Sequence, residues 1–151
     1  MRSVHILIAV AVVLTGCAGG PAEVENYPNV GPTNVMVRFT TSNGYRAVFG
    51  VNDLDDTCES HFRGSVVLQP GINKISLKPG QPTFIKVAIF KVNYRGNFTT
   101  HSGTILIPGA NTRYEVDVQY QDSMSDVRFY QLTKQDRKEL TIVPRSACRP
   151  K

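Results

Sequence analysis

The side chains that could carry chemistry in this 151-residue chain gather in one acidic segment, residues 53–61. A cysteine and a histidine three residues apart could supply two ligands to a metal, but a structural zinc site needs three or four ligands at matched spacing. The surrounding carboxylates are calcium-type ligands, yet the segment lacks the glycine and closing glutamate of an EF-hand loop. We therefore expect a solvated acidic loop with no metal and no cofactor, formed by Asp53, Asp55, Asp56, Cys58, Glu59 and His61.

A nucleophile activated by a nearby base is the other chemistry to consider. His101 and Ser102 are adjacent in a predicted strand and so point to opposite faces of it. The acidic neighbours of Cys58 disfavour the thiolate that a nucleophilic cysteine needs. The chain also has no G-x-S-x-G, Walker or G-x-G-x-x-G motif. We expect no catalytic residue and a protein that is not an enzyme.

The elements that position these residues are predicted to be strands. From residue 35 onward apolar and polar residues alternate, which is typical of sheets buried on one face. Seven to nine short strands separated by turn signals indicate an all-β protein, a small immunoglobulin-like or transthyretin-like β-sandwich over residues 34–151. One short helix is the only helical candidate, at 133–139. The expected strands are 35–40, 45–51, 62–68, 72–77, 83–94, 97–107, 112–120, 127–132 and 140–143.

Three strands end in a Pro-Gly pair, at Pro70-Gly71, Pro79-Gly80 and Pro108-Gly109. Proline presets the second residue of a turn, and glycine supplies the positive φ that a type II turn needs at the third. We expect three such turns. The loops at 52–60, 93–97 and 122–126 are candidate contact surfaces, because recognition residues of sandwiches often lie on end loops or open sheet edges.

The first residues differ from the rest of the chain. Arg2 precedes an apolar run of nine residues, 6–14, which is too short to span a bilayer and is typical of a signal peptide. The run ends in Leu14-Thr15-Gly16-Cys17, which resembles the lipobox of bacterial lipoproteins. The resemblance implies that 1–16 is a cleaved signal peptide and that Cys17 is acylated, fastening the protein to a lipid bilayer.

The resemblance also bears on location. In the lipoprotein family an Asp after the lipidated Cys favours the inner membrane, and here Ala18 stands there. We expect a lipid-anchored protein of the outer membrane, with the periplasmic face favoured over the cell surface. Residues 17–33 have the Gly, Pro and Ala content of a linker, and we expect a flexible tether with an end-to-end distance of about 20–25 Å.

If Cys17 carries lipid, Cys58 and Cys148 remain. An even remainder in an exported chain predicts one disulfide. The flanking charges agree, because Cys58 lies among carboxylates and Cys148 among basic residues, although each exposed ion pair is worth only about 0–1 kcal/mol. We expect a Cys58–Cys148 bond that secures the C-terminus.

Removing Arg2 with the signal leaves 16 basic and 12 acidic residues, a charge of about +4. The C-terminal cations Arg145, Arg149 and Lys151 are therefore candidate binding residues. We expect a non-enzymatic accessory module that contacts another envelope component, either protein or glycan. The alternative is a binding module or inhibitor that recognises an anionic glycan or a lytic enzyme through this basic segment. Nucleic acid is not expected as a partner outside the cytoplasm.

Overall fold

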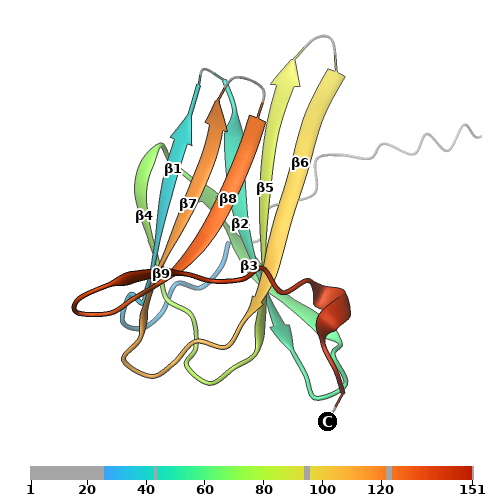
Figure 1. Cartoon of the computed structure of the whole chain (residues 1–151). Helices are drawn as coiled ribbons and strands as arrows, with labels where there is room; N and C mark the ends of the chain where they lie inside the picture. Colours follow the sequence, from blue (N-terminus) through green and yellow to red (C-terminus); the bar gives the residue numbers. More distant parts are fainter. Residues whose placement is uncertain (1–25, 43, 94–95, 122–123, 151) are drawn as a thin grey trace, which may run out of the picture.

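A computed structural model describes residues 26–42, 44–93, 96–121 and 124–150 (Figure 1). The predicted signal peptide and the predicted lipidation site, Cys17, lie outside the described residues. Within these ranges, no helix has the length and apolar content to cross a membrane. The described elements are β1 (Val35–Thr41), β2 (Arg46–Leu54), β3 (Ser60–Leu68), β4 (Gly71–Ile75), β5 (Thr83–Asn93), β6 (Gly96–Leu106), β7 (Arg113–Gln121), β8 (Met124–Leu132), β9 (Arg137–Glu139) and η1 (Arg145–Ala147).

The strands form two sheets packed against each other, so the predicted all-β sandwich is confirmed. The five-stranded sheet has the order β4-β1-β7-β8-β9, and the four-stranded sheet has the order β3-β2-β5-β6. Paired strands are antiparallel except β1 and β7, which run parallel with Val35 opposite Tyr114. Parallel neighbours need a long connection, and here strands β2 to β6 lie between them in the chain.

The core lies between the sheets and follows the alternation seen in the sequence. In β7 the inward positions are buried and the intervening ones are partly or fully exposed. Each fully buried aliphatic or aromatic side chain stabilises the fold by about 1.5–3 kcal/mol relative to exposure. Among the largest side chains of this core are Phe39, Phe49, Ile75, Ile85 and Ile89.

The chain before β1 is bound to the sandwich in its described part. We call residues 26–34 the N-terminal strap. The Tyr27 amide donates to the Ser65 carbonyl of β3 at 2.9 Å, and the Tyr27 hydroxyl donates to the Ser76 carbonyl, just after β4, at 2.8 Å. The strap therefore joins the edges of both sheets. The Gly, Pro and Ala content of residues 17–33 predicted a flexible tether, because it disfavours regular structure. This composition does not prevent the described part of the segment from hydrogen bonding to the sandwich.

A glycine in β3 makes room for this strap. Gly64 has φ +125°, and a Cβ built on it would lie 2.7 Å from the Cα of Tyr27. No side chain fits in that space without moving the strap's backbone. Gly64 is therefore required both by its backbone conformation and by the close approach of Tyr27.

Two predicted elements near the C-terminus are wrong. Residues 133–139 form a turn and then β9, with the Thr133 hydroxyl accepting from the Asp136 amide at 2.9 Å. The Thr133 amide also donates to the Asp136 carbonyl at 2.9 Å. Such local bonds compete with helix formation, and they override the helix preference of the Lys, Gln and Arg residues here. Residues 140–143 form no strand.

The Pro-Gly turns follow the prediction at two of three places. Gly71 and Gly80 have φ values of +100° and +76°, and Gln81 donates to the Lys78 carbonyl across the second turn at 3.4 Å. At the third, the residue with positive φ is Asn111 and not Gly109. The prediction is wrong there because the turn forms later, closed by the Thr112 amide on the Gly109 carbonyl.

The Gly64→Ala substitution is expected to cost about 2–3 kcal/mol of unfolding free energy, because it adds backbone strain and displaces Tyr27. Urea unfolding followed by circular dichroism measures this. Gly50→Ala is the matched control, since a Cβ at this other strand glycine would meet its nearest atom at an ordinary 3.5 Å. Equal unfolding midpoints for the two variants would contradict the role given to Gly64.

Candidate functional site

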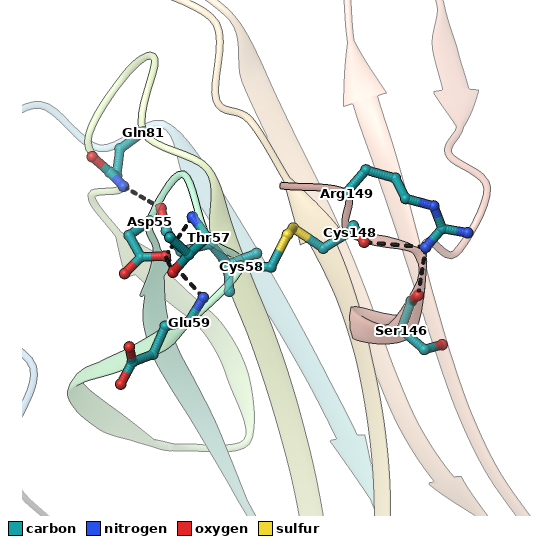
Figure 2. The surroundings of a disulfide bond; sticks show 9 residues. Asp55, Thr57, Cys58, Glu59, Gln81, Ser146, Cys148 and Arg149 are labelled. Atoms are coloured by element: carbon teal, nitrogen blue, oxygen red, sulfur yellow. Dashed lines mark hydrogen bonds between the residues drawn. A yellow bond between two sulfur atoms is a disulfide. The ribbon is translucent and has the colours of Figure 1, made fainter. Parts of the chain in front are cut away.

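The C-terminal segment crosses from one sheet to the other and ends on a disulfide. We call residues 140–148 the C-terminal strap. The Leu140 amide donates to the Phe129 carbonyl of β8 at 2.7 Å, and the Val143 carbonyl accepts from the Ile105 amide of β6 at 2.8 Å. Cys148 then bonds to Cys58 with a Cα–Cα distance of 5.9 Å, which confirms the predicted pairing (Figure 2). The strap thus closes the side of the sandwich opposite the N-terminal strap (Figure 1).

The acidic segment is a tight turn at the tip of the β2–β3 hairpin. Strand β2 extends to Leu54, so the predicted loop 52–60 is shorter than expected. One oxygen of Asp55, Oδ1, accepts from the Thr57 amide, the Thr57 hydroxyl and the Glu59 amide at 2.7–2.9 Å. These bonds fix the turn that presents Cys58, itself at φ +65°, to the C-terminal strap.

The other Asp55 oxygen, Oδ2, lies 3.0 Å from Nε2 of His61. Hydrogen bonding to His61, Thr57 and Glu59 holds the pKa of Asp55 well below its usual range, and the bond to Asp55 raises the pKa of His61. Asp55, Glu59 and His61 each have one possible metal-ligand atom within 4.8 Å of those of the other two. All three side chains are exposed, and the oxygens of Asp55 already accept protein hydrogen bonds. The Cys-x-x-His metal pair weighed from sequence is ruled out, because Cys58 is in a disulfide.

Two carboxylates of the acidic turn pair with the facing strand β3 and not with Arg145 or Arg149. Asp53 is paired with Arg63 and Asp55 with His61, both from the facing strand β3. Arg149 donates to the carbonyls of Ser146 and Cys148 in its own turn, pointing away from the carboxylates (Figure 2). Arg145 is exposed, and Lys151 lies outside the described residues.

Three of the four sheet edges in the described chain are protected against another strand. The β3 edge carries the N-terminal strap at Ser65. Strand β4 has five residues, and the Asn29 side chain binds the Lys74 carbonyl on it at 2.8 Å. Strand β9 has three residues, all exposed and charged, and it pairs only with Tyr130–Leu132 of β8. The part of the β8 edge that β9 does not cover carries the charged pair Asp126 and Arg128. Short, charged or covered edges are the usual means of preventing unwanted strand pairing.

The fourth edge, β6, is protected only near the C-terminal end of the strand, at Ile105. The Ile105 amide bonds to Val143 and not to β5, so the backbone groups of Ile105 point away from β5. Alternate residues of a strand point the same way, so the N–H and C=O groups of Gly103 and His101 also point away from β5. At His101 and Gly103 no described residue accepts or donates to this outward backbone. Strand β6 is eleven residues long and contains no Pro, Lys, Arg, Asp or Glu. An open, uncharged edge of this length fits strand addition.

A charged network on the outer face of the five-stranded sheet was not predicted. Arg137 of β9 donates to both Glu115 and Asp117 of β7, and its guanidinium carbon lies 3.5 Å from the ring centre of Tyr130. Arg38 lies 3.7 Å from the other oxygen of Asp117. The positions of Glu115 and Asp117 in the alternating pattern of β7 predicted that both side chains face outward. Their partners could not be predicted, because Arg38 and Arg137 lie far from them in the sequence.

Replacing both cysteines, Cys58→Ala with Cys148→Ala, should lower the free energy of unfolding by up to about 4–5 kcal/mol, since the bond closes a separation of 90 residues. Urea unfolding measures the change, and the unsubstituted protein in reductant is the control. Hydrogen exchange at the Ile105 amide should accelerate in the variant, because the strap that protects it is released. An unchanged midpoint with unchanged Ile105 protection would show that the strap holds without the disulfide.

Comparison of the chain with protein-family models, with characterised proteins and with solved structures finds no match. No relative therefore supplies a substrate, a partner or a set of site residues. The surfaces that the fold itself presents are the basis for assigning a function, and the open edge of β6 is the first of them.

Proposed function

We propose that this protein is a membrane-anchored envelope lipoprotein that acts without catalysis, by adding a strand of another envelope protein to the edge of β6. The anchor rests on Leu14-Thr15-Gly16-Cys17, with its preceding apolar run. Two or three acyl chains on one cysteine hold a protein on a bilayer far more firmly than a single chain. Ala18 favours the outer membrane among the possible locations.

The N-terminal strap limits how far such a domain could stand from its membrane. Between Cys17 and the bound residue Asn26 there are nine peptide steps, which reach at most about 30 Å when fully extended. An acylated Cys17 would therefore keep the sandwich close to the lipid surface. A partner for this module is most simply another component of the same envelope.

The observation that carries the binding role is the unpaired backbone of β6 at His101 and Gly103. Main-chain hydrogen bonds supply affinity in strand addition, and alternate side chains supply specificity. The neighbouring edge of β8 adds hydroxyl groups, since Ser125 lies 3.5 Å from Thr100 across the same side of the sandwich. A partner strand along β6 would thus meet polar groups of both sheets.

The Cys17→Ser substitution should move the protein from the membrane fraction to the soluble fraction, because serine offers no thiol for the lipid. Metabolic labelling with radioactive palmitate measures the modification, and fractionation of cells measures the location. Cys58→Ser is the matched control, since it also replaces one cysteine by serine but should leave palmitate on the protein. Unlabelled protein without substitution, or labelled Cys17→Ser, would contradict the anchor.

The binding role is tested by His101→Pro against His101→Ala. Both remove the imidazole, but proline also removes the outward N–H, which has no partner among the described residues. Crosslinking in intact cells should capture the same partner with the unsubstituted chain and with His101→Ala, and at least tenfold less with His101→Pro. Thermal unfolding confirms that both variants fold. Equal capture by the two variants would rule out strand addition at β6.

A further inference from the structure

Two adjoining hollows lie on the outer side of the five-stranded sheet, where β1, β7 and β8 meet the N-terminal strap. One has a volume of about 250 Å³ and the other about 440 Å³, and Arg113 and Leu132 line both of them. They therefore adjoin each other, and we call the two hollows together the groove. It lies apart from the β6 edge, which belongs to the other sheet.

The groove is cationic. Lys74 of β4 lines the first hollow, Lys134 lines the second, and Arg113 lies between them. No carboxylate lines either hollow. None of the three cations forms an ion pair with a described residue.

The carboxylates nearest along β7 are already bound to other cations. Arg137 forms ion pairs with Glu115 and Asp117, and Arg38 forms one with Asp117. The basic residues of this face thus separate into a neutralised group and an unneutralised one. The three unpaired cations lie along two adjoining hollows, and Arg113 lines both, so an anion bound at Arg113 would lie between Lys74 and Lys134.

The rest of the lining indicates the kind of anion. Met36 and Leu132 provide an apolar surface, and Asn111 provides an amide. The Thr133 hydroxyl is already bonded to Asp136 in its own turn. A guanidinium binds phosphate through two parallel hydrogen bonds. The first hollow, about 250 Å³, suits a compact group such as phosphate, and the second, about 440 Å³, lies within the usual 300–1,000 Å³ of small-ligand sites.

We propose that this groove binds a phosphorylated saccharide, with the phosphate on Arg113 between Lys74 and Lys134 and the sugar ring over Leu132. Sugar hydroxyls then reach the Asn111 side chain. This site differs from the basic C-terminal residues, where Arg149 donates to carbonyls of its own turn. It is also independent of strand addition at β6, so either activity could be absent without the other.

The test is isothermal titration of the full chain in a non-ionic detergent with glucose 6-phosphate, glucose and inorganic phosphate. Glucose 6-phosphate should bind at one site, at least tenfold more tightly than either of the other two. Arg113→Gln should weaken its binding at least tenfold, and the affinity should fall as sodium chloride rises. Arg145→Gln is the matched control, because it removes an equal charge outside the groove, and it should change the affinity less than twofold.

Several outcomes would overturn the proposal. Equal weakening by Arg113→Gln and Arg145→Gln would mean diffuse charge attraction and not a site. Inorganic phosphate binding as tightly as glucose 6-phosphate would mean that no sugar is recognised. Binding to phosphatidylglycerol vesicles or to a hexaglutamate peptide that is lost in Arg113→Gln, without binding of glucose 6-phosphate, would assign the groove to a lipid headgroup or to an acidic protein.

Discussion

The disulfide between Cys58 and Cys148 is the bond on which the closed side of this sandwich depends. Alternating strands hold the two sheets face to face, but no backbone hydrogen bonds between β8 and β6 are described on the side where these two strands lie. The C-terminal strap crosses that side with few hydrogen bonds, and every residue from 141 to 147 is exposed. Apolar burial therefore contributes little to holding it, and the covalent bond at its end confines it. Where the strap reaches Ile105, it also sets the lower limit of the open β6 edge.

The opposite side of the sandwich, between β3 and β4, is closed by hydrogen bonds and close packing and not by a covalent bond. The N-terminal strap is held by hydrogen bonds from Tyr27 and Asn29 and by the close approach that Gly64 permits. Its last residues, Thr33 and Asn34, line the cationic groove. The strap therefore runs from Ser65 of β3, beside Asn26, to the groove on the other sheet.

Sequence periodicity predicted the strands well where one face is buried, as in β7 with Tyr114, Val116 and Val118. It could not predict contacts that carry no periodic signal. The N-terminal strap lacks alternation, and its attachment depends on a space that Gly64 leaves in a strand far along the chain. Cysteine counting predicted the disulfide, but the charges along the chain did not show which residues pair with Asp53 and Asp55. These two carboxylates pair with Arg63 and His61 of the facing strand, to which the hairpin register brings them close.

Counting charges along the chain pointed to the C-terminal cations as a binding site, whereas the folded surface points to the groove on the five-stranded sheet. Counting along the chain treats every cation as available, whereas folding pairs some of them and leaves others. In the five-stranded sheet Arg38, Arg128 and Arg137 each meet a carboxylate, from the adjacent strand, from the same strand and from two strands away respectively. Lys74, Arg113 and Lys134 come from β4, β7 and the β8–β9 turn, and only the strand order places them along two adjoining hollows. A surplus of positive charge becomes a binding site only where the fold gathers unpaired cations around a cavity, and in the described chain this groove meets that condition.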